Sequence, residues 1–197
     1  MIIKHRQWKS LLEKAGNVLF IGLLLWVMFS PDVKSWLLQR FMSVGLFNAK
    51  IGNEKRVTNE SASPISFSFR DEKGNIFTTT ELKGKVIFIN FWATWCPPCR
   101  AEMPALNDLY HQFRNDKRVV FLFLNEDNDP GKAATYMLNN RFIMPVMTTT
   151  GNVSSEIYSG TLPTTIIMDK EGKIVYKHEG LARYNSKSFI SQLQALL

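Results

Sequence analysis

The stretch Phe91-Trp-Ala-Thr-Trp-Cys-Pro-Pro-Cys-Arg100 contains both cysteines of the chain, Cys96 and Cys99. It follows the apolar run 86–91, which predicts a strand buried on both faces. It leads into residues 97–113, where apolar side chains recur at helical spacing. Two cysteines separated by two residues, at the junction of a buried strand and a helix, indicate a redox-active pair.

The position of the pair predicts how it reacts. Cys96 is expected at the N-terminus of the helix, where unpaired backbone N–H groups and the helix dipole stabilise a thiolate. Such a position lowers the pKa of a cysteine from about 8.5 into the range of about 3.5–7.5. Cys99 is expected one turn later, on the same side and deeper. We therefore expect Cys96 to attack a disulfide first and Cys99 to resolve the mixed disulfide.

The remainder of residues 64–197 predicts a single α/β domain. Alternating residues over 65–69, a turn at 71–74 and a return strand from Ile76 predict a β-hairpin. The later expected elements are a buried strand over 119–124, a helix from Pro130 to about Asn140 capped by Asn128 or Asp129, an extended piece at 145–147, a short helix near 153–158, a strand over 164–168, a returning strand over 173–177 and a last helix from Ser186 to Leu197. We expect a central mixed sheet flanked by helices, with the hairpin at its N-terminal end.

The charge distribution and the composition argue against several classes of function. The net charge is +7, but residues 1–61 contain 9 Lys and Arg against 4 Asp and Glu, so the excess is concentrated near the N-terminus. That distribution favours a membrane flank over a nucleic-acid groove, and we expect no nucleic-acid partner. The three histidines, His5, His111 and His178, lie far from the cysteines in the sequence. We therefore expect neither a metal site nor a cofactor.

The first 29 residues predict a membrane anchor. Residues 1–14 form a basic flank, and residues 15–29 are apolar apart from Asn17. Extended back to Leu11, the apolar segment approaches the ~30 Å thickness of a hydrocarbon core at ~1.5 Å per residue. We predict a transmembrane anchor over 15–29 with the flank in the cytoplasm. A cleaved signal peptide and a buried helix of a soluble protein are the alternatives, although no Ala-x-Ala-like cleavage site follows Phe29.

Residues 30–63 are predicted to contain an amphipathic helix and a polar tether. Apolar residues recur at helical spacing over 33–47, between polar residues that prevent this segment from spanning a membrane. The helix lies either in the membrane interface or against the globular domain, and the sequence favours neither alternative. The polar residues 48–63 indicate a flexible tether that ends at Pro64.

The cysteine motif, its aromatic lead-in and the following Glu102-Met-Pro104 resemble the TlpA/ResA-like branch of the thioredoxin family. Lys83-Gly-Lys85 and Leu162-Pro-Thr-Thr165 add to the resemblance, which covers about residues 64–197. Asn90 stands where general cytoplasmic thioredoxins carry a buried acid. This difference points to the same branch and leaves Glu102 as the better candidate for proton transfer.

The resemblance implies a thioredoxin-like fold and a protein-disulfide reductase that acts on exported proteins. Many members of the branch serve cytochrome c maturation, which makes apocytochrome c one candidate substrate. The implied electron donor is a membrane conduit of the CcdA/DsbD type. The implied location is the bacterial inner membrane, with a single-pass anchor and the catalytic domain facing the periplasm.

The resemblance also assigns roles beyond the two cysteines. Pro163 matches the family's cis-proline beside the dithiol, and the backbone at Leu162 would pair with an extended substrate; an ordinary proline that opens a strand is the alternative. Glu102 matches an acid that assists proton transfer, although an acid early in a helix also suits the helix dipole. Trp95 and Pro97 flank the first cysteine and are expected at the substrate-binding rim. For Trp95, plain packing is an equal alternative.

Two other functions fit the same motif. A disulfide oxidase or isomerase would use the same cysteines with the exchange running in the opposite direction, although no large helical insertion of a dedicated oxidase is evident. A copper-binding assembly module would use Cys96, Cys99 and His178 as soft ligands. Copper assembly proteins of related fold usually present CxxxC, whereas this chain has CxxC.

Overall fold

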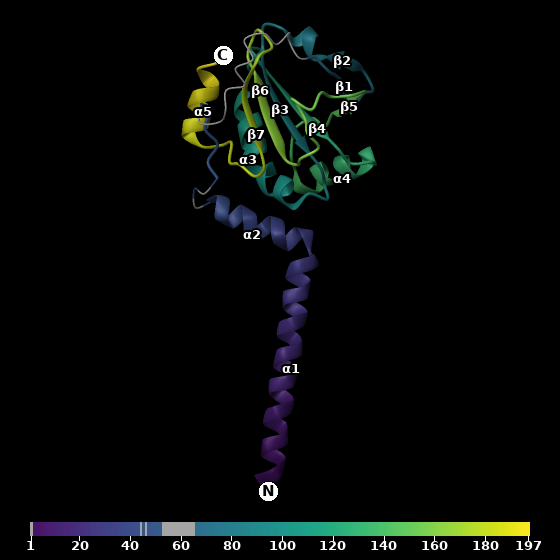
Figure 1. The fold of residues 1–197 in the computed structure, drawn as a ribbon, viewed down its shortest axis with the longest axis vertical. Helices are drawn as coiled ribbons and strands as arrows, with labels where there is room; N and C mark the ends of the chain where they lie inside the picture. The colour runs from purple at the N-terminus through teal and green to yellow at the C-terminus, as the bar shows by residue number, and fades with distance from the viewer. Residues whose placement is uncertain (1, 44, 46, 53–65) are drawn as a thin grey trace.

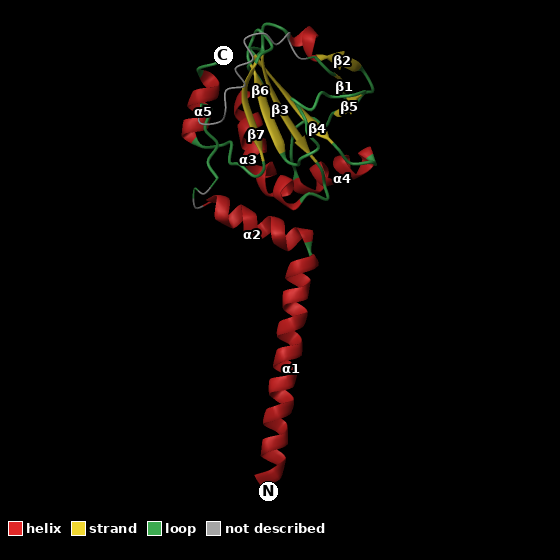
Figure 2. Ribbon diagram, viewed as in Figure 1, coloured by secondary structure: helices red, strands yellow, loops and turns green. Residues whose placement is uncertain are grey.

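A computed structural model describes residues 2–43, 45, 47–52 and 66–197, with side chains from Lys14 onward except those of residues 28 and 43. Two N-terminal helices precede an α/β domain (Figures 1 and 2). The elements in chain order are α1 (Ile2–Phe29), α2 (Pro31–Ser43), β1 (Ser68–Arg70), β2 (Ile76–Thr78), the 3-10 helix η1 (Thr79–Leu82), β3 (Val86–Trp92), α3 (Pro97–Phe113), β4 (Val119–Asn125), α4 (Pro130–Asn140), β5 (Thr148–Thr150), β6 (Thr164–Met168), β7 (Ile174–Glu179) and α5 (Lys187–Gln194).

A four-stranded mixed sheet in the order β4-β3-β6-β7 forms the centre of the domain. Strands β3 and β4 are parallel, whereas β6 runs antiparallel to both of its neighbours, β3 and β7. Every residue of β3 and β6 is buried, which explains why their sequences are apolar without alternation. The strands expected over 86–91, 119–124 and 164–168 are confirmed, as is the returning strand β7.

Alternate residues of β3 face two hydrophobic cores. Phe88 and Trp92 pack into a core completed by helices α3, α4 and α5. Ile87 and Ile89 face the other side of the sheet, where Phe69 of the hairpin covers them. Helices on one face and the hairpin on the other confirm the predicted thioredoxin-like architecture.

Helix α3 has the predicted bounds, but the segment between α4 and β6 departs from the prediction. Strand β5 begins at Thr148, after the expected extended piece, and pairs with β1. The short helix expected near 153–158 is wrong: Ile157 and Tyr158 both donate their backbone N–H to the Ser154 carbonyl, and the chain makes a single turn there. Six residues form too few intrahelical hydrogen bonds to offset the cost of helix nucleation.

Helix α1 extends away from the domain, and α2 turns beneath the domain (Figure 1). The described side chains from Lys14 to Trp26 are all exposed. Within the described residues, no helix taken singly has the length and hydropathy of a membrane span. The segments Lys14–Val27 and Pro31–Met42 meet those requirements only as a pair, with a bend of 78° between them.

The first residues of the polar tether predicted over 48–63 pack on the domain. Ala49 is buried and donates its backbone N–H to the Arg183 carbonyl, and Arg183 in turn donates its N–H to the carbonyl of Phe47. The chain around Ala49 therefore packs on the domain as a short extended segment. The later part of the predicted tether, from residue 53 to 63, lies outside the described residues.

Candidate active site

The two cysteines lie where β3 passes into α3. Helix α3 begins at Pro97, so Cys96 is its N-cap residue and has an extended backbone. A disulfide joins Cys96 to Cys99, whose Cα atoms are 5.3 Å apart. The Sγ of Cys96 accepts a hydrogen bond of 3.2 Å from the backbone N–H of Cys99. The predicted position at the helix N-terminus is confirmed, and in the reduced protein this N–H group would stabilise a Cys96 thiolate.

The rim of the site is exposed, although its sulfur atoms are not. Cys96 is 4% exposed and Cys99 is completely buried, so Cys96 is the sulfur nearer to solvent. Trp95 is 62% exposed and stands directly before the dithiol. Pro97 is half-buried in the first turn of α3, where its missing N–H costs no intrahelical hydrogen bond.

An aspartate fixes the loop that carries Trp95. The Asp127 carboxylate accepts hydrogen bonds from the backbone N–H of Thr94 at 3.1 Å and from its hydroxyl at 2.8 Å. The amide of Asn125 donates to the same carboxylate at 2.7 Å. This contact was not predicted from the sequence. Because β3 and β4 are parallel, polar residues at and just after the end of β4 lie at the edge where β3 ends. The pattern Asn125-x-Asp127 was therefore the available signal.

The proline loop meets the dithiol at the same edge of the sheet. Thr164, the first residue of β6, pairs with Phe91 near the end of β3, so the preceding Pro163 lies beside the start of the cysteine loop. The Leu162–Pro163 peptide bond is cis, as the resemblance implied. Pro163 is buried, its carbonyl accepts from the Gly180 N–H at 2.8 Å, and Leu162 is half-buried.

A carboxyl group is enclosed behind the cysteines. Glu102 is completely buried on the same face of α3 as Cys99. Its carboxyl oxygens accept from the Asn90 amide at 2.8 Å and from the backbone N–H of Ala182 at 3.3 Å. Burial raises the pKa of Glu102 to about 8, because these two hydrogen bonds offset only part of the lost hydration. The Asn90 amide also donates to the Thr165 hydroxyl at 2.9 Å, which fixes its orientation.

Helix α2 packs directly on the first turn of the active-site helix. The Ser35 hydroxyl shares its single hydrogen between the Pro31 carbonyl of its own helix, at 2.7 Å, and the Pro97 carbonyl, at 3.1 Å. The Gln39 amide donates to the Arg100 carbonyl at 3.3 Å. The Arg100 guanidinium pairs with Asp32. Of the two alternatives for this helix, docking on the domain is therefore observed, although no sequence pattern indicated these particular contacts.

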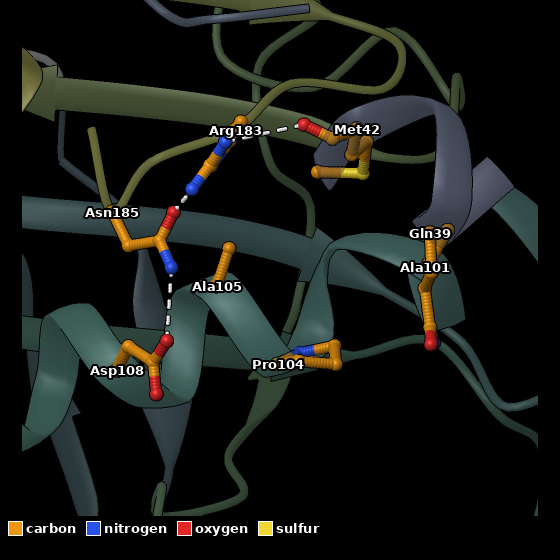
Figure 3. Close-up of a pocket in the computed structure, with 8 residues that line it drawn as sticks. All are labelled: Gln39, Met42, Ala101, Pro104, Ala105, Asp108, Arg183 and Asn185. Carbon is orange, nitrogen blue, oxygen red and sulfur yellow. Dashed lines mark hydrogen bonds between the residues drawn. The ribbon is translucent and has the colours of Figure 1, made fainter. Parts of the chain in front are cut away.

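A pocket lined by α2, α3 and the loop 183–185 lies behind this contact (Figure 3). Arg183 donates to the Met42 carbonyl at 3.3 Å and to the Asn185 side chain at 2.8 Å. The Asn185 amide donates to Asp108 at 2.8 Å. This chain of hydrogen bonds joins the end of α2 to the middle of α3.

The histidines do not gather around the sulfur atoms. His111 is exposed on α3, and His178 lies within β7, opposite Thr165 of β6. In the described part of the chain, no cluster of three or more His, Cys, Asp or Glu side chains is placed to hold a metal ion. His5 lies outside the residues with described side chains.

Comparisons with known proteins agree with this geometry. The family model described as Redoxin matches residues 58–190. Thiol-disulfide oxidoreductase ResA of a Bacillus cereus strain is 36% identical over 113 residues, which cover 57% of this chain and 65% of that protein. Thiol-disulfide oxidoreductase ResA of Bacillus subtilis (strain 168) is 30% identical over 131 residues, which cover 66% of this chain and 72% of that protein. The match to the B. cereus relative thus spans slightly less than two thirds of its length.

A solved structure has a similar fold. A candidate thiol-disulfide oxidoreductase from Bacteroides vulgatus resembles this chain with a TM-score of 0.57 and 28% sequence identity. The similarity covers 68% of this chain and 93% of the Bacteroides protein. It therefore includes most of the domain that holds the cysteines.

Proposed function

This chain belongs to the redoxin family, and from that premise we propose that it is a thiol–disulfide oxidoreductase that reduces disulfides of exported proteins. The observation that carries the proposal is the environment of Cys96. Its sulfur atom lies at the N-terminus of α3, accepts a hydrogen bond from the Cys99 N–H, and is bonded to a second, deeper sulfur atom. A nucleophile with an attached resolving thiol is what disulfide exchange requires.

The exchange proceeds in two steps that move two electrons to the substrate. The Cys96 thiolate attacks one sulfur atom of the substrate disulfide, a mixed disulfide forms, and the first substrate thiolate leaves. Cys99 loses its proton and attacks Cys96 Sγ, which breaks the mixed disulfide and releases the second substrate thiolate. The Cys96–Cys99 disulfide that remains must be reduced by a dithiol donor. We assign that role to a membrane conduit of the CcdA/DsbD type.

We assign to Glu102 the movement of the proton at Cys99. Its pKa of about 8 lies close to the ordinary pKa of a thiol, about 8.5, so a proton can pass between the two groups at little cost in free energy. Both groups face the enclosed side of α3, where bulk water does not compete. If the Glu102→Gln variant kept the pH profile of the resolving step, this role would be excluded.

We propose that an extended segment of the substrate binds along the Leu162–Pro163 backbone, between this loop and the exposed Trp95. A main-chain pairing of this kind needs little sequence specificity. It therefore suits an enzyme with several exported substrates, and we include apocytochrome c among them. Pro97, in the first turn of α3, completes this rim.

We propose that residues 15–29 anchor the chain in the bacterial inner membrane. Within α1, residues 15–29 extend about 22 Å at 1.5 Å per residue, and continuation of the segment back to Leu11 brings it to about 28 Å, close to the ~30 Å hydrocarbon core. Its apolar side chains from Val18 to Phe29 include nine large ones that are 49–75% exposed, so the domain does not cover them. The basic flank 1–14 would remain in the cytoplasm, and the catalytic domain would face the periplasm.

Insulin reduction by the full chain, with dithiothreitol as the electron source, tests the activity. We expect the wild-type chain to accelerate the reaction, the Cys96→Ser variant to be inactive, and the Cys99→Ser variant to accumulate a mixed disulfide with insulin. The two variants control for each other, because each removes one sulfur atom from the same disulfide. Acceleration by Cys96→Ser would disprove the proposal.

The dithiol potential determines the direction of exchange. A value below about −200 mV favours reduction of substrates, whereas a value near −120 mV favours the oxidase alternative. Equilibration of the full chain with glutathione buffers measures it.

A further inference from the structure

Helix α2 packs on the domain with its less apolar face. The buried positions of this helix include Ser35 and Met42, each 4% exposed. The opposite face carries Trp36, Leu37 and Phe41, which are 53%, 37% and 54% exposed. An amphipathic helix usually docks by its apolar side, so the outer face of α2 requires a partner that the domain itself does not supply.

The elements next to this face indicate what covers it. Helix α1 directly precedes α2 and carries exposed apolar side chains on all sides, as a segment surrounded by lipid would. The helix axis turns by 78° between Lys14–Val27 and Pro31–Met42. If α1 crosses a bilayer near its normal, α2 consequently lies close to the bilayer plane.

The charged residues of the outer face fit the same environment. Lys34 and Arg40 are exposed beside the apolar side chains, and the Arg40 guanidinium lies 5.2 Å from the centre of the Trp36 ring. Basic residues next to tryptophan and phenylalanine are typical of helices at the boundary between lipid headgroups and acyl chains. A soluble protein partner would not explain the continuity of this face with α1.

We propose that α2 lies on the phospholipid surface, with Trp36, Leu37 and Phe41 at the headgroup boundary. The proposal rests on the membrane anchor of the proposed function. The opposite face of α2 holds the first turn of α3 through the bonds from Ser35 and Gln39. The lipid surface and the dithiol are thus separated by about one helix diameter, roughly 10–12 Å. The active site faces the membrane side of the domain, within reach of a membrane-resident dithiol donor.

Collision measurements on nitroxide labels test this placement. The single variants Leu37→Cys and Phe41→Cys of the full chain are labelled with the native disulfide intact and reconstituted into vesicles of phosphatidylethanolamine and phosphatidylglycerol. The readout compares collisions with oxygen, which dissolves in lipid, with collisions with a water-soluble nickel chelate. Labels at Glu171→Cys, at the far end of the sheet, and at Leu24→Cys, within α1, serve as references for water and for lipid.

We expect the oxygen-to-nickel ratio at positions 37 and 41 to exceed that at position 171 severalfold and to lie below that at position 24. Ratios at 37 and 41 equal to that at 171, with a lipid value at 24, would overturn the position of α2 but leave the anchor intact. A water-like value at 24 would overturn both. Dipolar broadening that disappears on dilution with unlabelled protein would assign the face to a second copy of the chain instead. Insulin reduction by the same vesicles reports separately on the proposed activity.

Discussion

At the scale of single residues, the unusual group is the Glu102 carboxyl. Burial raises its pKa to about 8 from an unfolded-state value of 4.5. Between these values the folded protein keeps a proton that the unfolded chain releases. Because the unfolded state then binds fewer protons, the free energy of unfolding falls as the pH rises from about 4.5 to about 8.

The substitution Glu102→Gln should remove this decrease in the free energy of unfolding with rising pH. The neutral amide can still accept the hydrogen bond from Asn90 and carries no charge to desolvate. We expect the variant to gain stability relative to the wild type as the pH rises, reaching a few kcal/mol near pH 8.5, since one pKa unit corresponds to about 1.4 kcal/mol. Urea unfolding of both oxidised proteins at about pH 5, 7 and 8.5 measures the difference.

A second variant serves as a control for the effect of removing any carboxylate. Asp116 is half-buried and has its pKa lowered to about 2 by hydrogen bonds from Arg118, so its removal should not produce a gain in stability at alkaline pH. Asp116→Asn is therefore the matched variant. Stability curves of Glu102→Gln and wild type that stayed parallel across this pH range would show that Glu102 titrates normally.

At the scale of elements, α2 and α3 behave as one unit. The Ser35 hydroxyl is buried and donates to the carbonyl of Pro97, between the two cysteines. Ser35→Ala leaves this carbonyl without that donor. Because the hydroxyl hydrogen is shared with the Pro31 carbonyl, we expect a loss of about 1 kcal/mol of stability. Urea unfolding of the variant and the wild type, compared side by side, detects a change of this size.

The exposed neighbour Lys34 provides the control, because Lys34→Ala changes the same turn of α2 without a described contact to α3. We expect its stability to remain within about 0.5 kcal/mol of the wild type. Equal losses in Ser35→Ala and Lys34→Ala would mean that helix propensity of α2, and not the bond to Pro97, causes the effect.

Some of the strands and helices were predictable from the sequence, and others were not. The runs that became β3 and β4 are almost entirely buried, so their apolar composition alone identified them. In β6, two buried threonines precede the apolar residues 166–168. The bounds of α3 were predictable because Pro97 starts the helix and the apolar spacing ends at Phe113. Strand β5 was not predictable, because three threonines become a strand only through pairing with β1, about 80 residues earlier.

Likewise, only part of the candidate site was predictable from the sequence. The dithiol and Glu102 share one helix, so their relative positions follow from a spacing of three residues. The partners of Glu102 come from β3 and from Ala182, which only the folded chain brings together. The orientation of α2 could not be predicted either, since its apolar side faces outward and its buried side is held by hydrogen bonds.

At the scale of the whole molecule, we expect the N-terminal boundary of the folded unit to lie before residue 64. The sequence placed that boundary at residue 64, but α2 and the segment around Ala49 cover α3 and the loop at Arg183. Met42 and Ala49 are 4% and 5% exposed, so removing them uncovers apolar surface of the domain.

Two truncations separate these boundaries. A chain that starts at Ser30 keeps α2 and should be as stable as the full chain, because α1 makes few contacts with the domain (Figure 1). A chain that starts at Pro64 loses the contacts of α2 and of Ala49, and we expect it to be less stable by on the order of 3 kcal/mol, given about 25 cal/mol for each Å² of apolar surface exposed. Urea unfolding at pH 7 compares the two soluble proteins, and insulin reduction shows whether each retains the dithiol chemistry. Equal midpoints would place the boundary at residue 64 after all and would make α2 an appendage, whereas the expected difference makes it part of the scaffold that holds the active-site helix.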